Sequence, residues 1–100
     1  MLDLLFGCCQ RVLCADAVLL EQLRAAGFRC GGGHWQFTLP ALHGYLQGQL
    51  ADGRAIDYSG FVKALYASEL NQRLRELGGH VVIADNHGKI SSTQYALQRL

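Results

Sequence analysis

Apolar residues near the start of the chain recur with the 3.6-residue period of an amphipathic helix. This pattern predicts helical structure from Leu2 to Ala26. Asp16 interrupts the apolar stripe and has a side chain suited to cap a new helix. The segment is therefore either one long helix or two helices with a break at residues 14–16. Gly27 then provides a typical helix stop.

The pattern changes to strict alternation after the first helical segment. Trp35, Phe37 and Leu39 alternate with polar residues, which predicts a short strand. The three glycines at 31–33 connect this strand to Phe28 through a flexible link or a loose hairpin.

The middle of the chain predicts a second helix. Apolar residues keep helical spacing from Leu39 to Leu50, and Thr38 can cap this segment. Pro40 lies in its first turn, where the missing N–H costs nothing.

A third and longer helix is predicted from Tyr58 to Leu77. Asp57 is its expected N-cap, and Ile56 with Phe61 forms an expected hydrophobic staple. The apolar stripe turns by roughly 110° along the segment at 100° per residue. This drift indicates either a central helix contacted from two directions or a kink near Ser68, and we favour the central helix.

The end of the chain favours two strands. His80 to Ala84 is a β-type run, residues 85–88 form a turn, and Ile90 to Leu97 can return as the second strand. Ser91 and Gln94 also fit a capping box, so a short helix over residues 92–100 is the alternative. We expect a single domain over residues 1–100, of the α+β class. It would have three main helices, a short strand near Trp35 and a C-terminal β-hairpin packed on the third helix.

The composition of the chain favours association with a partner. Half of the residues are hydrophobic, only 17% are charged and the net charge is +1, against about 25% charged residues in a typical domain. Low charge favours association, so we expect a protein partner or a second copy to cover apolar surface. The sequence has no apolar run near the ~18 residues of a membrane span. It also has no convincing secretory signal, so we expect a cytoplasmic protein with reduced cysteines.

The large aromatic residues are the first candidates for a partner site. They are Trp35, Tyr45, Tyr58, Tyr66 and Tyr95. So small a core has no room to bury all of them fully, and Tyr and Trp are frequent interface anchors. Core packing is the ordinary role of any one of them, but we expect at least one to anchor a contact.

Metal and thiol chemistry have weaker support. The four cysteines are Cys8, Cys9, Cys14 and Cys30, with no C-x2-C pair of the kind that structural zinc sites use. Cys30 and His34, on either side of the glycines, are the remaining candidates for a metal site or a nucleophilic dyad. No acidic residue nearby in sequence would orient His34, so we expect a flexible connection, no catalytic residues and no cofactor.

The second half of the chain is similar to the end of winged helix-turn-helix domains. The matching segments are Leu74–Gly79, Val81–Ile83, Asp85–Gly88 and Tyr95–Leu97, in which a helix ends in Leu-x-x-Leu-Gly and a two-stranded wing ends in Tyr-x-Leu. The resemblance implies DNA binding through the helix at 58–77 and a wing at 85–89. The candidate phosphate contacts are then Arg54, Lys63, Arg73, Arg75 and Lys89.

Three features depart from that family. The helix is longer than a usual recognition helix, the segment at 51–57 is long for the turn, and Lys63, Arg73 and Arg75 form no stripe on the helical wheel. We therefore expect a small non-catalytic domain that binds a protein or itself through an apolar, aromatic surface. A winged-helix DNA-binding protein is the second hypothesis, and a Cys/His metal or thiol protein is the third.

Overall fold

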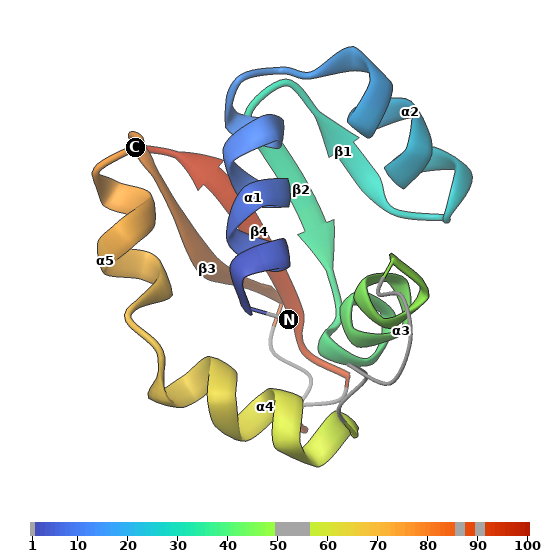
Figure 1. Cartoon of the computed structure of the whole chain (residues 1–100), viewed down its shortest axis with the longest axis vertical. Coiled ribbons are helices and arrows are strands. Elements are labelled where there is room, and N and C mark those ends of the chain that lie inside the picture. The colour runs from blue at the N-terminus through green and yellow to red at the C-terminus, as the bar shows by residue number, and fades with distance from the viewer. Residues whose placement is uncertain (1, 50–56, 86–87, 90–91) are drawn as a thin grey trace.

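The computed structural model describes residues 2–49, 57–85, 88–89 and 92–100. These residues form five helices and one antiparallel sheet of four strands (Figure 1), which confirms the α+β class. In chain order the elements are α1 (Leu2–Leu13), α2 (Ala17–Ala25), β1 (Arg29–Gly31), β2 (His34–Phe37), α3 (Leu39–Gln49), α4 (Tyr58–Ala67), α5 (Leu70–Arg75), β3 (Gly79–Asp85) and β4 (Gln94–Arg99).

The N-terminal segment is two helices, separated where Asp16 interrupts the apolar stripe. The Asp16 carboxylate accepts hydrogen bonds from the backbone N–H groups of Val18 and Leu19, and it also binds the Arg11 guanidinium at 2.8 Å. Gly27 ends α2 with a φ of 95°. This glycine donates to the Arg24 carbonyl and the next residue donates to the Leu23 carbonyl, as in a Schellman motif.

The helical caps predicted for the next two helices are present. The Thr38 hydroxyl accepts from the Ala41 N–H at 3.4 Å at the start of α3. The Asp57 carboxylate accepts from the Gly60 N–H at 2.8 Å at the start of α4. Ile56, the other half of the expected staple with Phe61, lies outside the described residues.

The prediction of one long third helix is wrong, because the segment at 58–77 forms two helices that run in different directions (Figure 1). Ser68 is extended, with φ −84° and ψ 161°. Its hydroxyl and its backbone N–H both donate to the Leu65 carbonyl, which ends α4. The drift of the apolar stripe is explained by this break, and so the kink that we ranked second is the correct interpretation.

The C-terminal segment is a strand, and the alternative helix over residues 92–100 is wrong. The strand begins later than predicted, at Gln94, because Thr93 is held in a turn by hydrogen bonds from its N–H and hydroxyl to the Lys89 carbonyl. β4 pairs with β3 on one side and with β2 on the other. The hairpin expected at the C-terminus therefore joins the strand near Trp35 in one sheet, in the order β1-β2-β4-β3.

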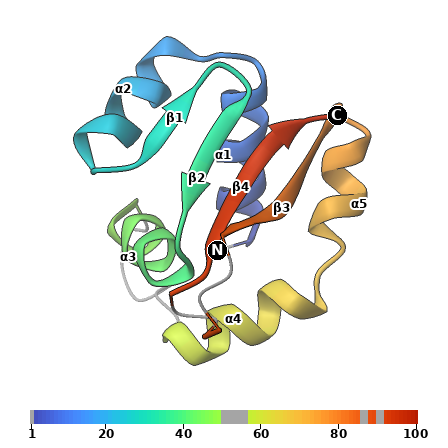
Figure 2. The same cartoon turned by 180° about the vertical axis from the view of Figure 1, so that it is seen from behind.

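The two faces of the sheet differ in chemistry. Trp35, Phe37 and Leu97 are buried on the face that α1 crosses. Gln36 and Gln98 lie on the opposite face, which is seen in front of α1 in Figure 2. The hydrophobic core thus fills the layer between the sheet and the helices. In Figure 2, α4 closes this layer at the bottom and α5 lies along the side next to β3.

Candidate functional site

A half-open cavity of about 230 Å³ lies between the helices and the apolar face of the sheet. Its lining comes from seven elements and from the link between α4 and α5: Leu5, Phe37, Leu39, Leu42, Leu65, Tyr66, Ser68, Leu70, Asn71, Val81 and Tyr95. A buried apolar cavity of roughly 150 Å³ is enough to bind benzene. The cavity therefore has room for one ring or one large side chain, but it is smaller than the ~300 Å³ of ordinary ligand pockets.

The floor and the rim of this cavity differ. Four apolar residues that are almost inaccessible to solvent form the floor: Leu5, Phe37, Leu39 and Leu42. The polar groups are on the more exposed residues Tyr66, Ser68, Asn71 and Tyr95. The described lining residues include no Asp, Glu, His, Lys or Arg, so this part of the site offers no charged side chain to a ligand.

Two tyrosine hydroxyls meet at the cavity. The hydroxyls of Tyr66 on α4 and Tyr95 on β4 are 2.8 Å apart and share a hydrogen bond. Burial, and then the bond to Tyr66, raises the pKa of Tyr95 to about 12. Burial and the nearby Tyr66 also raise the pKa of Tyr58, whose hydroxyl is buried without a partner among the described residues. The phenols of Tyr58 and Tyr95 are therefore neutral at physiological pH.

Asn71 fixes one wall of the cavity. Its side-chain carbonyl accepts from the Val81 N–H at 2.8 Å, and its amide donates to the Val81 carbonyl at 3.1 Å. β3 is an edge strand, and these two hydrogen bonds satisfy backbone groups that a neighbouring strand would otherwise bind. They also attach α5 to the sheet. This role was not predictable from the sequence, because it depends on a contact with a residue ten positions away.

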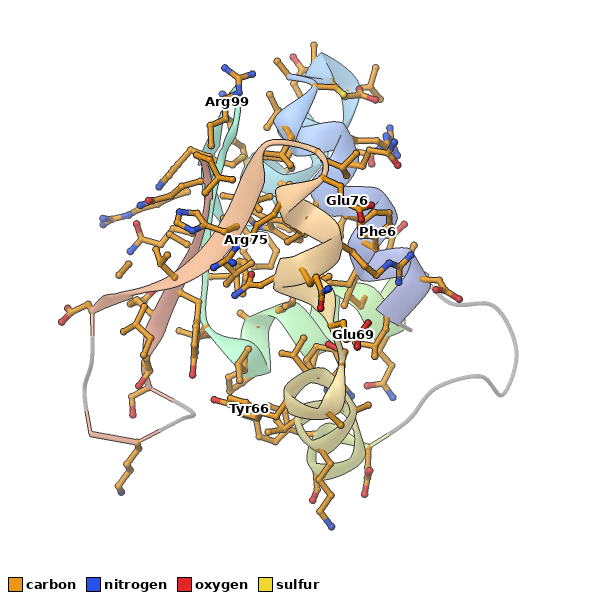
Figure 3. All side chains as sticks on the ribbon, turned by 90° about the vertical axis from the view of Figure 1, so that its left-hand side faces the viewer. Phe6, Tyr66, Glu69, Arg75, Glu76 and Arg99 are labelled. Atoms are coloured by element: carbon orange, nitrogen blue, oxygen red, sulfur yellow. The ribbon has the colours of Figure 1, made fainter. Side chains whose placement is uncertain are left out.

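Two large apolar side chains are exposed beside the cavity. Tyr66 is 59% exposed and Ile83 is 58% exposed. Ile83 pairs directly with Tyr95, so both residues lie on the same face of the sheet. We call Tyr66, Ile83 and Tyr95 the apolar rim. Figure 3 shows Tyr66 at the end of the molecule opposite Arg99, below α5.

The structure separates the five predicted anchor residues. Trp35 is fully buried in the core, so it offers no exposed surface. Tyr45 is half-buried and packs edge-on against Phe28, away from the cavity lining. Only Tyr66 and Tyr95 line the cavity, with Tyr58 close to both. Ile83 was missed because a single exposed apolar residue in a strand gives no sequence signal.

The candidate DNA contacts are dispersed. Arg54 lies outside the described residues, and Lys63 and Lys89 are exposed on α4 and after β3. The Arg73 guanidinium lies 4.1 Å from the centre of the Phe6 ring, and its nearest nitrogen is 3.9 Å from the Asp3 carboxylate. It therefore contacts α1. Arg75 extends on the other side of α5 from Glu76 (Figure 3). The continuous helix that the winged-helix resemblance implies is absent.

The cysteine hypothesis finds no assembled site. Cys30 pairs with Trp35, whereas His34 pairs with Gly31, so alternation places Cys30 and His34 on opposite faces of the sheet. Burial raises the pKa of Cys8, and it raises that of Cys9 to about 12, so both remain unreactive thiols. No cluster of three or more metal-ligating side chains occurs among the described residues.

Comparison with known proteins adds no identification. The chain matches no family model, no curated protein and no solved structure. In the part of the chain that the structure describes, no helix has the length and apolar character needed to cross a membrane.

Proposed function

We propose that this protein is a non-catalytic interaction domain that binds a protein partner at the cavity and its apolar rim. The observation that carries the proposal is an uncharged, half-open cavity flanked by the exposed side chains of Tyr66 and Ile83. Apolar side chains that surround a pocket are typical centres of protein interfaces, and Tyr is common among them. The partner would insert one apolar side chain and cover the rim.

The mechanism is the removal of apolar surface from water. Burial is worth about 25 cal/mol per Å² of apolar area, so a side chain that fills the cavity supplies a concentrated part of the affinity. The low charge of the chain, with a net charge of +1, agrees with an association that depends little on ion pairs. Four free cysteines, two of them buried in the core, agree with a reducing compartment such as the cytoplasm.

The test uses site-specific photocrosslinking at two matched positions. A crosslinking residue at Ile83 is expected to trap a defined partner. The same residue at Gln98, exposed on the opposite face of the sheet, is expected to trap none. The partner is then purified, and its affinity is measured directly by calorimetry. Ile83→Lys should weaken binding at least tenfold, whereas Gln98→Lys should leave it unchanged. Equal crosslinking from both positions would contradict the proposal.

A second copy of the chain is an alternative partner at the same rim. Sedimentation velocity over a range of concentrations distinguishes the two. A dimer that is lost in Ile83→Lys and kept in Gln98→Lys makes the partner a second copy. A monomer at all concentrations leaves a different protein as the partner.

DNA binding is the less favoured proposal. Lys63 lies on α4, Arg73 and Arg75 lie on α5, and Lys89 follows β3. Arg73 already contacts Phe6 and Asp3. Binding to phosphates depends on clustered cations and weakens steeply with salt. We expect no salt-dependent binding of labelled duplex DNA into the high micromolar range. Binding with a steep salt slope would favour the winged-helix hypothesis instead.

A further inference from the structure

The distribution of polar groups around the cavity restricts what can enter it. The floor, formed by Leu5, Phe37, Leu39 and Leu42, contains no polar side-chain atom. The hydroxyls of Tyr66 and Tyr95 belong to more exposed residues that also line the cavity. A group that reaches the floor must therefore be apolar at its tip, and any polar atoms of the partner must remain near the rim.

We infer that the cavity takes the side chain of a phenylalanine from the partner, with the adjoining peptide backbone hydrogen-bonded to the tyrosine hydroxyls at the rim. This inference rests on the proposed function and names the recognised group. Within the Tyr66–Tyr95 pair one hydroxyl donates to the other, which leaves one hydroxyl hydrogen and several lone pairs for a peptide group.

Three observations favour a phenyl ring over other side chains. The volume of about 230 Å³ exceeds what a benzene ring needs. The rings of Phe37, Tyr66 and Tyr95 line the cavity, so an inserted ring gains aromatic contacts that an aliphatic side chain lacks. None of the described residues that line the cavity is charged, so this lining disfavours charged side chains, whose burial without a partner is costly.

A tyrosine is disfavoured by the same floor. Its hydroxyl would lie among buried leucines without a hydrogen-bond partner, a cost that corresponds to a loss of roughly 5-fold or more in affinity. The selectivity for phenylalanine over tyrosine is therefore the measurable consequence of an apolar floor beneath the hydroxyls of Tyr66 and Tyr95.

The first experiment uses the wild-type protein and two side-chain analogues. Toluene represents phenylalanine and p-cresol represents tyrosine. Titrations are followed by the NMR shifts of methyl groups that line the cavity, such as those of Leu65 and Val81. Toluene is expected to shift these methyls and to bind at least about 5-fold more tightly than p-cresol. Equal or tighter binding of p-cresol, or no shift with either compound, would overturn the inference.

The second experiment tests the role of the hydroxyls. The ligands are toluene and a capped pentapeptide with phenylalanine at its centre and glycine elsewhere. In the double variant Tyr66→Phe/Tyr95→Phe, the peptide should bind about 2- to 10-fold more weakly, while toluene should bind as before. Tyr45→Phe, the same chemical change away from the cavity lining, should alter neither affinity. A loss of both affinities in the double variant would show a structural effect and contradict the role of the hydroxyls.

Failure of this inference is separable from failure of the proposed function. If the partner trapped from Ile83 has no phenylalanine in its crosslinked segment, then the identity of the inserted group is wrong and the interaction site stands. If no partner or second copy binds at the rim while toluene still prefers the cavity over p-cresol, then the proposed function is wrong and the pocket chemistry stands.

Discussion

Helices α1 and α4 have similar compositions and very different environments. Eight of the twelve residues in α1 are hydrophobic and five of its residues are buried. Seven of the ten residues in α4 are hydrophobic, yet only Phe61 is buried. The difference arises from position, because α1 crosses the sheet whereas α4 lies at one end of the molecule (Figures 1 and 2). Two residues of α4, Leu65 and Tyr66, line the cavity.

This comparison shows where the fold leaves apolar surface available. The layer under α1 and α2 is filled by side chains with no exposure, such as Val12, Leu23 and Trp35. Beside α4, by contrast, the packing leaves the cavity, and the ring of Tyr66 at its edge is exposed to solvent. Apolar composition alone therefore marks both a core helix and a binding helix, and only the packing distinguishes them.

The largest expected effect is a difference between two leucine truncations. Leu23→Ala removes a fully buried side chain from α2 and should lower the free energy of unfolding by about 2–5 kcal/mol. Leu65→Ala removes a half-buried side chain from the cavity lining and should cost about 1 kcal/mol. Urea unfolding of both variants measures this. Equal losses would show that the α4 region is packed as tightly as the N-terminal one.

The next effect concerns the tip of the β1–β2 hairpin. Gly33 has a φ of 78°, and its N–H donates to the Val12 carbonyl at the end of α1. A Cβ atom at Gly33 would also approach the Arg99 side chain, which donates to the Leu13 carbonyl. Gly33→Ala should therefore cost about 1–2 kcal/mol or more.

Gly31→Ala is the matched control, because an added Cβ there meets nothing within 4 Å and the φ of Gly31 is not positive. Thermal unfolding should show a lowered midpoint for Gly33→Ala and a nearly unchanged one for Gly31→Ala. A similar decrease in both variants would mean that the hairpin needs flexibility in general and not the specific conformation at Gly33.

Local signals in the sequence predicted much of this fold. The caps at Asp16 and Asp57 and the helix stop at Gly27 act within a few residues, so they were readable without a structure. The break at Ser68 lacks proline or glycine, and the only signal for it was the drift of the apolar stripe. The pairing of β2 with β4 is a long-range contact, which no local pattern encodes.

The candidate site was predictable only in part, for the same reason. Tyr58, Tyr66 and Tyr95 were recognisable as candidate anchors from their type. Their convergence depends on the break between α4 and α5, which turns Tyr66 towards the sheet to meet Tyr95. The cavity itself is a property of packing between seven elements, so no residue pattern could reveal it.

A smaller effect is expected at the edge of β3. Asn71→Ala removes both side-chain bonds to Val81 and should lower stability by about 1–2 kcal/mol. Gln72→Ala, at the exposed neighbouring position, should stay within about 0.5 kcal/mol of wild type. Hydrogen exchange at the Val81 amide gives an independent measurement and should accelerate only in Asn71→Ala. Unchanged exchange in this variant would show that α5 protects the edge by contact alone.

The last effect is a dependence of stability on alkaline pH. The pKa of Tyr95 is raised from an ordinary value of 10.0 to about 12, and that of Cys9 from 9.0 to about 12. The unfolded chain therefore releases these protons at lower pH than the native state does. Between the ordinary and the raised pKa values, the native state binds more protons than the unfolded chain. The contribution of Tyr95 and Cys9 to the free energy of unfolding is therefore complete below pH 9 and is lost as the pH rises towards 12.

Urea unfolding between pH 8 and pH 11 tests this dependence and separates the two regions of the molecule. Tyr95→Phe removes the tyrosine contribution at the rim and should flatten the decrease above pH 10. Cys9→Ala removes the contribution from the core under α1 and should flatten the decrease that begins near pH 9. A decrease of the same slope in Tyr95→Phe and wild type would mean that burial and the hydrogen bond to Tyr66 do not raise the pKa of Tyr95 in solution.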